Sequence, residues 1–210
     1  MPERARLRVG VLASGRGSNF QSMVTAAAEG RIPAEVVLLL SDRPGAGALE
    51  FARARGIPAE VVEPREHPGR EAHDKALIDL LEARRVGLVC LAGYMRILGS
   101  GFVEHFRGRL LNIHPSLLPA FPGLHAQRQA LEHGVAVAGA TVHFVDEGTD
   151  TGPIVVQAAV PVLPDDTEAS LSDRILAAEH RIYPEAIRLF AEGRLRIEGR
   201  RVRILEEGRA

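Results

Sequence analysis

Five short apolar runs alternate with amphipathic helical segments in the first half of the chain, and this alternation limits the fold more than any other feature. The runs and the helical segments between them span residues 7–13, 19–29, 36–40, 46–55, 58–62, 71–84, 87–92 and 110–113. Strands that are apolar throughout are typical of a parallel sheet with both faces covered. The sequence therefore predicts an α/β fold, a Rossmann-like and mostly parallel twisted sheet with helices on both faces.

The second half of the chain changes pattern. Residues 139–145 and 154–160 alternate as two strands joined by a polar turn. Residues 167–190 have helical periodicity; Asp166 or Thr167 is the expected N-cap, and Pro184 is expected to end or kink the first part.

The tail at 195–204 alternates about Gly199, which predicts a short C-terminal hairpin after the helix. No linker, repeat or low-complexity stretch interrupts the chain. We therefore expect one domain over residues 1–210, with a core at about 6–193 and the hairpin tail at about 194–205.

The charge balance argues against a protein that coats nucleic acid, because 26 basic residues face 27 acidic ones and the net charge is −1. No stretch approaches the roughly 20 apolar residues that span a bilayer, and the charged start does not resemble a signal peptide. The single cysteine, Cys90, fits a reducing compartment. We expect a cytoplasmic monomer or homodimer that binds small molecules and neither nucleic acid nor membrane.

Three loops leave the carboxyl ends of predicted strands, where parallel sheets bind ligands: 14–19, 93–98 and 112–123. The first reads Ser-Gly-Arg-Gly-Ser-Asn and opens a helix, so its glycines and the helix N-terminus favour an anion. It lacks the dinucleotide fingerprint and the Walker lysine, which suits one phosphate better than a pyrophosphate. Ser18 or Asn19 could cap the helix or bind the anion, and a plain tight turn is the alternative.

Asn112 and His114 lie two residues apart at the end of the fifth strand, so strand alternation places them on one face. An amide and an imidazole side by side can stabilise an oxyanion on a carbonyl carbon. Pro115 and Pro119 stiffen the chain beyond them, and we expect a cis peptide bond at Leu118–Pro119. A structural histidine at a strand end is the alternative, and the residues alone do not decide.

The polar turn at 146–153 carries three carboxylates, Asp146, Glu147 and Asp150. One of them could lie beside His114 and stabilise its imidazolium form, although acidic glycine-rich turns are also common without any function. The residues alone do not identify which carboxylate does this. His143, just before the turn, could support the group, and the histidines show no metal-ligand spacing, so we expect no metal.

Residues 111–119, Leu-Asn-Ile-His-Pro-Ser-Leu-Leu-Pro, resemble the signature of enzymes that use 10-formyltetrahydrofolate. The 14–19 loop, Ala-Gly-Tyr-Met-Arg-Ile-Leu at 92–98, and Glu179-His180 before Tyr183-Pro184 narrow the resemblance to the phosphoribosylglycinamide formyltransferase family. The likeness extends to about Gly193. It departs at Arg16, a variable loop position, and at Thr151, where glycine is common; either could alter loop geometry.

The resemblance implies transfer of a formyl group from 10-formyltetrahydrofolate, as co-substrate, to the amine of N1-(5-phosphoribosyl)glycinamide in de novo purine synthesis. It implies a catalytic triad of Asn112, His114 and Asp150. It places the substrate at Gly17, Ser18, Asn19, Phe20, Gln21 and Glu179. It places the folate at Arg70, Met95, Arg96, Ile97, Leu98, Asn112, Asp146, Glu147, Gly148, Thr149 and Asp150.

Two alternatives stay open. A 10-formyltetrahydrofolate hydrolase would use the same triad but give the formyl group to water, and fast formate release without the amine substrate would favour it. A non-enzymatic phosphate-binding module would need only the sheet and the glycine-rich loop, and phosphate-dependent binding without folate affinity would favour that module.

Overall fold

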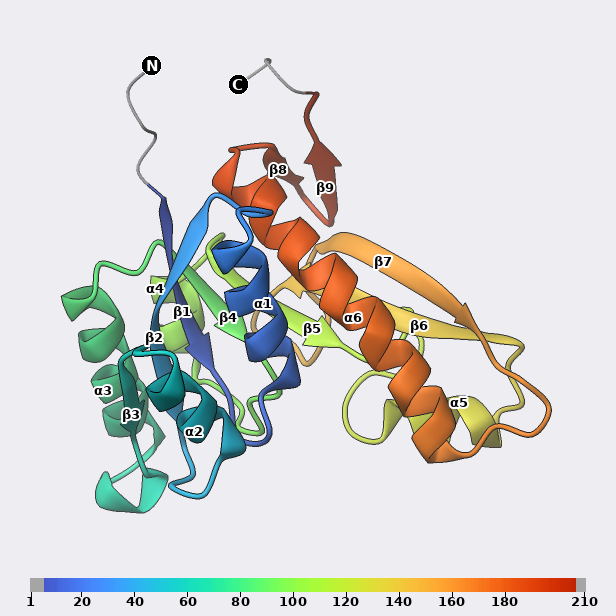
Figure 1. The fold of residues 1–210 in the computed structure, drawn as a ribbon, viewed down its shortest axis with the longest axis horizontal. Coiled ribbons are helices and arrows are strands. Elements are labelled where there is room, and N and C mark those ends of the chain that lie inside the picture. The colour runs from blue at the N-terminus through green and yellow to red at the C-terminus, as the bar shows by residue number, and fades with distance from the viewer. Residues whose placement is uncertain (1–5, 207–210) are drawn as a thin grey trace. The chain divides into compact units, whose positions relative to one another are not determined.

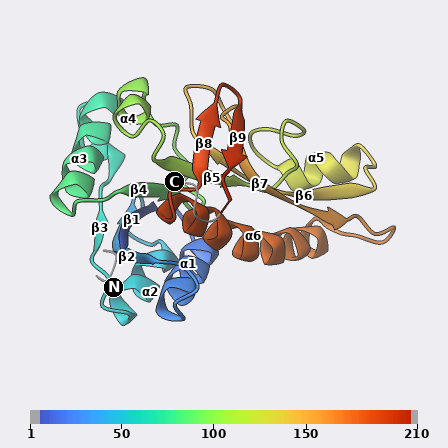
Figure 2. The same ribbon diagram turned by 90° about the horizontal axis from the view of Figure 1, so that it is seen from above.

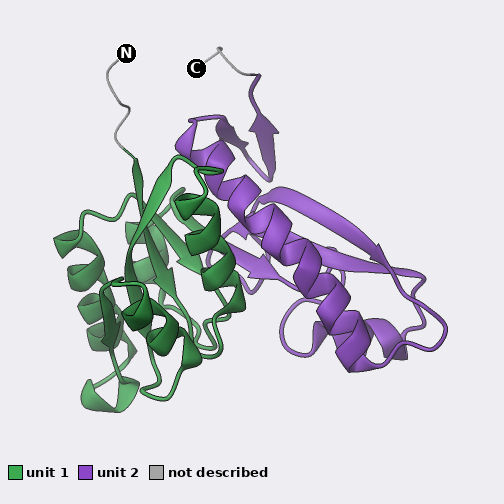
Figure 3. Ribbon diagram, viewed as in Figure 1, with its two compact units in different colours: residues 1–111 green, residues 112–210 purple. Residues whose placement is uncertain are grey.

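A computed structural model describes residues 6–206 of the 210-residue chain. The chain divides into two compact units, residues 1–111 and 112–210, shown in different colours in Figure 3. Strand β5 (Leu110–His114) contains the boundary between them. The expectation of one domain over the whole chain stays a prediction.

The first unit contains a parallel sheet of strands in the order β3-β2-β1-β4. The strands are β1 (Leu7–Leu12), β2 (Ala34–Ser41), β3 (Ala59–Val61) and β4 (Leu88–Leu91). The helices are α1 (Ser18–Ala28), α2 (Gly47–Ala54), α3 (Arg70–Ala83) and α4 (Ser100–His105), with a 3-10 turn η1 (Pro64–Glu66). Helices α1 and α2 lie on one face of these strands, and α3 and α4 lie on the other (Figures 1 and 2).

The two-sided cover explains why these strands are apolar throughout. In β2, Leu38, Leu39 and Leu40 are all fully buried although their side chains alternate between the two faces. Phe20 and Met23 of α1 are fully buried as well. The predicted mostly parallel α/β fold with helices on both faces is confirmed.

The second unit is mixed. Strands β6 (Val137–Phe144) and β7 (Ile154–Pro161) pair antiparallel, and the hairpin β8 (Leu195–Glu198) and β9 (Arg201–Ile204) joins the edge of β7. Helix α6 (Glu168–Ala191) runs along β6 and β7 (Figure 1), and α5 (Ala126–Glu132) precedes β6. The predicted hairpin is confirmed. Helices α4 and α5 were not predicted, because six and seven residues are too few to establish a helical period.

Helix α6 begins as predicted and ends at Ala191, one residue beyond the predicted range. Thr167 Oγ1 accepts the Ser170 N–H, while Ser170 Oγ accepts the Thr167 N–H, so Thr167 is the N-cap in a reciprocal capping box. Pro184 was expected to end or kink the first part of the helix; the helix runs on through Pro184 to Ala191, so Pro184 does not end it. Tyr183 and Ile187, within one turn of Pro184, are fully buried, and this packing offsets the hydrogen bond that proline removes. Among residues 6–206, no helix is long and apolar enough to cross a bilayer.

Gly139 in β6 provides a test of the close packing between β6 and β7. A Cβ at this position would overlap the Ala158 carbonyl oxygen and approach Leu117 Cδ2 to 2.8 Å. We expect Gly139→Ala to lower the free energy of unfolding by about 1–3 kcal/mol, since the backbone must shift to admit the methyl group. Urea unfolding measures the change.

The matched control is Gly101→Ala in α4, where a Cβ meets nothing within 4 Å. Alanine favours a helix over glycine by about 1 kcal/mol, so this variant should be neutral or more stable. Equal stability losses in the two variants would contradict the packing argument.

Candidate active site

Three side chains from two separated segments of the second unit meet at the end of β5. His114 Nδ1 lies 3.3 Å from Asp150 Oδ2, and Asn112 Nδ2 lies 3.4 Å from Asp150 Oδ1. Asn112 and His114 share a face of β5, as strand alternation predicts. Asp150 comes from the turn between β6 and β7. Of the three carboxylates in that turn, Asp150 is therefore the one that reaches His114.

The ring of His114 faces an oxygen on each side. Its Nε2 lies 2.8 Å from the Phe121 carbonyl oxygen, while Nδ1 faces the Asp150 carboxylate. Both partners only accept hydrogen bonds. The doubly protonated imidazolium satisfies both of them, whereas either neutral tautomer leaves one nitrogen without a proton to donate. His114 is 5% exposed, so water has little access to either contact.

Asp150 is held ionised by several partners. Burial raises the pKa of its carboxyl, but the contact with His143, the Gly123 N–H and the charges of the two imidazoles outweigh burial and hold the pKa below its usual range. The Gly123 N–H donates to Oδ2 at 2.8 Å. Asp150 itself has a φ of 55°, in the left-handed region that few non-glycine residues adopt. The carboxylate thus has a fixed position and a fixed charge.

His143 is a fourth member of this group, and the residues alone suggested only that it could support the site. It lies at the end of β6 and is 2% exposed. Its Nδ1 is 2.9 Å from the Phe144 carbonyl oxygen, so this nitrogen donates. Its Nε2 is 3.2 Å from Asn112 Nδ2 and 3.6 Å from Asp150 Oδ1. A neutral ring can accept from the Asn112 amide, and a charged ring can pair with Asp150.

The loop after His114 is anchored to the strands beside it. Thr141 Oγ1 accepts the Leu118 N–H at 3.1 Å and donates to the Ser116 carbonyl at 2.7 Å. Gln157 Nε2 donates to the Leu118 carbonyl at 2.9 Å. The peptide bond at Leu118–Pro119 is cis, which confirms the expectation from the sequence. The loop that carries Phe121 and Gly123 is therefore fixed from its first residues.

Asp146 shapes the turn that carries Asp150. Its Oδ1 accepts the Gly148 N–H at 3.1 Å and the Thr151 hydroxyl at 2.6 Å. A Cβ at Gly152 would overlap the Phe144 carbonyl oxygen, so the turn needs glycine there. The departure from the resembling family at Thr151 thus adds a hydrogen bond to the turn. Glu147, Gly148 and Thr149 are exposed at its tip.

The glycine-rich loop of the first unit turns at Gly17, which has a φ of 72° and is the N-cap of α1. A Cβ there would lie 2.6 Å from Ala48 Cβ, so this position requires glycine for space as well as for conformation. No side chain caps α1, and the helix already begins at Ser18. Of the two roles suggested for Ser18 and Asn19, capping is therefore contradicted, and anion binding stays a prediction. The first N–H bonded within the helix is that of Gln21, to the Gly17 carbonyl. The N–H groups before it lie at the helix terminus, which attracts an anion.

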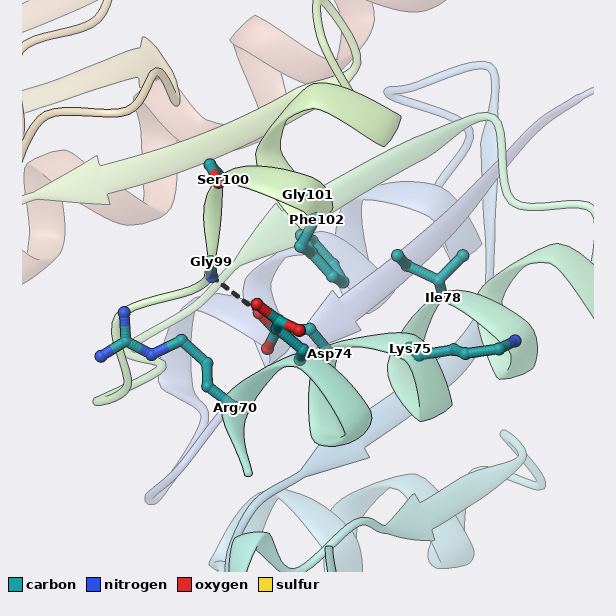
Figure 4. A pocket seen from close by; sticks show the side chains of 9 residues that line it. Arg70, Asp74, Lys75, Ile78, Gly99, Ser100, Gly101 and Phe102 are labelled. Atoms are coloured by element: carbon teal, nitrogen blue, oxygen red, sulfur yellow. Dashed lines mark hydrogen bonds between the residues drawn. The ribbon is translucent and has the colours of Figure 1, made fainter. Parts of the chain in front are cut away.

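The other predicted site residues occupy both units. Met95 and Ile97 are 61% and 72% exposed in the segment after β4. Arg70 begins α3 and lines a pocket of about 720 Å³ together with Asp74, Gly99 and other residues of α3 and α4 (Figure 4). Glu179 is buried in α6. Phe20 is fully buried, so only its backbone is available to a ligand.

Comparison with known proteins gives consistent likenesses. A sequence model described as formyl transferase matches residues 7–187. The trifunctional purine biosynthetic protein adenosine-3 of Drosophila melanogaster is 53% identical, over 92% of this chain and 14% of that protein. The chain thus spans 14–19% of the length of such trifunctional relatives. The phosphoribosylglycinamide formyltransferase of Bacillus subtilis is 46% identical, over 85% of this chain and 91% of that protein.

Solved structures extend the likeness to the fold. Glycinamide ribonucleotide transformylase 1 from Symbiobacterium toebii aligns with a TM-score of 0.95 at 60% identity, over 97% of this chain and 96% of that one. A formyltetrahydrofolate deformylase from Pseudomonas syringae aligns with a TM-score of 0.90 over 97% of this chain and 67% of that one, but is 23% identical and so shares the fold alone.

The lowered pKa of Asp150 gives a stability prediction with a definite sign. The folded state holds this pKa below the ordinary value of 3.8, so the ionised group stabilises the fold fully above that pH. The contribution is lost as the pH falls through the lowered value. We expect wild type to exceed Asp150→Asn in stability by a full margin at about pH 5, below the ordinary histidine range, and by a shrinking margin below about pH 4.

Urea unfolding of the two proteins at a series of pH values measures this margin. In the difference between the two proteins, the pH-dependent contributions of the carboxylates that both contain cancel. A margin that stays constant or widens as the pH falls below about 5 would contradict the assigned charge of Asp150.

Proposed function

The chain belongs to the formyl transferase family, and we propose that it transfers the formyl group of 10-formyltetrahydrofolate to the amine of N1-(5-phosphoribosyl)glycinamide. The observation that carries the proposal is the placement of His114 and Asn112 around the Asp150 carboxylate. The support from relatives comes mainly from the phosphoribosylglycinamide formyltransferases of Bacillus subtilis and Escherichia coli, whose lengths this chain covers to 91% and 90%.

The chemistry requires a group that stabilises negative charge on the formyl oxygen. The substrate amine attacks the formyl carbon, and the carbonyl oxygen becomes an oxyanion. Protonated His114 can donate Nε2–H to this oxygen in exchange for the Phe121 carbonyl, while Nδ1–H stays on Asp150. Asn112 Nδ2 carries two hydrogens, so it can keep one on its present partners and donate the other.

Collapse of the intermediate breaks the bond between the formyl carbon and the folate nitrogen. The proton lost by the amine moves to that nitrogen, and a water can carry it between the two. Asp150 remains ionised throughout, because its role is to hold the charge and orientation of His114.

The binding roles follow the family resemblance. We assign the substrate phosphate to the terminus of α1, at Gly17, Ser18, Asn19, Phe20 and Gln21, where backbone N–H groups and the helix dipole favour it. Glu179 would accept hydrogen bonds from the ribose hydroxyls. We assign the folate to Met95, Arg96, Ile97 and Leu98, to Asn112, and to the turn Asp146, Glu147, Gly148, Thr149 and Asp150, with Arg70 on its glutamate carboxylate.

The remaining expectations stay part of this proposal. We propose a cytoplasmic enzyme that acts on small molecules, as a monomer or a homodimer, with the folate as co-substrate and without a metal. The family match from 7 to 187 crosses the boundary between the two units, which supports one formyltransferase domain over the chain.

An absorbance assay for tetrahydrofolate release, run with and without N1-(5-phosphoribosyl)glycinamide, tests the activity. We expect His114→Ala to lower kcat by at least about 100-fold, since the donor to the oxyanion is lost. The control is His105→Ala, which removes an exposed histidine whose described side-chain contacts are with Glu82 and Phe106, away from Asn112, His114 and Asp150. It should retain wild-type turnover.

Normal turnover in folded His114→Ala would refute the mechanism. Formate release at the full rate without the amine substrate would instead favour the hydrolase alternative.

A further inference from the structure

Burial of side chains does not explain why the segment Met95, Arg96, Ile97 and Leu98 keeps one conformation. It lies in neither helix nor strand, and Met95 and Ile97 expose most of their surface. An irregular segment with so little buried apolar area needs specific hydrogen bonds to keep one conformation. Two such bonds are present, one at each end of the segment.

The first bond joins the segment to the turn after β1. The Met95 N–H donates to Ser14 Oγ at 2.8 Å, and the Ser14 N–H donates to the Gly93 carbonyl at 3.1 Å. Ser14 is 4% exposed, so its hydroxyl is shielded from water that could replace this contact. The two turns are therefore bonded in both directions at the start of the segment.

The second bond joins the segment's other end to α3. The Gly99 N–H donates to Asp74 Oδ2 at 2.7 Å, drawn as the dashed line in Figure 4. Asp74 is 5% exposed, and His73 Nδ1 lies 3.6 Å from its other oxygen. A Cβ at Gly99 would lie 2.8 Å from Asp74 Oδ2, so glycine permits the close approach.

We infer that Ser14 and Asp74 are positioning residues for the folate: they hold the 95–98 segment in its binding shape before the folate arrives. This inference rests on the proposed function, which assigns the segment to the folate. A ligand that meets a preformed segment avoids the entropy cost of ordering it, so loss of a tether weakens binding of that ligand. Neither side chain needs to touch the folate for this effect.

The test compares Ser14→Ala, Asp74→Ala and Asp74→Asn with wild type. We expect each alanine variant to raise KM for 10-formyltetrahydrofolate by about tenfold, the effect of losing one hydrogen bond. The value of kcat and the KM for N1-(5-phosphoribosyl)glycinamide should change by no more than about twofold. Asp74→Asn should stay near wild type, because its amide oxygen can still accept the Gly99 N–H.

The matched control is Asp79→Ala, on the same helix. Asp79 is an exposed carboxylate whose described contact is with Lys75, one turn away. It should leave both KM values unchanged. A general effect of removing a carboxylate from α3 would appear in this control as well.

Amide hydrogen exchange gives a readout that does not depend on activity. Ser14→Ala should speed exchange at the Met95 amide and Asp74→Ala at the Gly99 amide, while amides of β1 and β2 stay protected. Exchange can also be measured where an alanine variant has too little activity for kinetics. The Gly99 amide should then exchange faster in Asp74→Ala than in Asp74→Asn.

An unchanged folate KM in both alanine variants would overturn the inference, and so would an Asp74→Asn variant as impaired as Asp74→Ala. Failure of the proposed function looks different, because wild type itself would then release no tetrahydrofolate in the presence of both substrates.

Discussion

The Asp150 carboxylate is the interaction on which the candidate active site depends. One oxygen accepts the Gly123 N–H and pairs with His114, and the other faces Asn112 and His143. These four partners come from the loop after β5, from β5 itself and from β6. Removing the carboxylate would leave the Gly123 N–H and His114 Nδ1 without this acceptor, and an unpaired buried donor costs about 1–3 kcal/mol.

The backbone must adopt an unusual path to bring Asp150 to this place. Its φ of 55° is strained for a residue with a Cβ, at a cost of about 1 kcal/mol or more. The bonds from Asp146 to Gly148 and Thr151, and the close approach of Gly152 to Phe144, hold the turn in that path. The contacts made by the carboxylate offset the strain, so the turn and the cluster of side chains stabilise each other.

The sequence predicts the parts of this structure that follow from local periodicity. Apolar runs locate the strands of the first unit to within two residues, and alternation puts Asn112 and His114 on one face. Proximity across the chain is not local, so the residues alone could not choose Asp150 among three carboxylates; the family resemblance chose it. The contacts of His143 with Asn112 and Asp150 could not be predicted either, because they also join residues far apart in the chain. The prediction that Pro184 could end α6 failed because the burial of this helix outweighs the low helix propensity of proline.

The 95–98 segment and the loop after His114 lie outside helices and strands, yet buried side chains bind the main chain in or next to each of them. Ser14 and Asp74 do so in the first unit, and Thr141 does so in the second. Each hydrogen bond contributes little net free energy, but breaking it would leave a buried polar atom without a partner. The cost of that unpaired atom favours a single conformation. A motif identifies the residues that meet a ligand. The shape of the surface that the ligand meets depends equally on residues that never touch it, and only the fold reveals them.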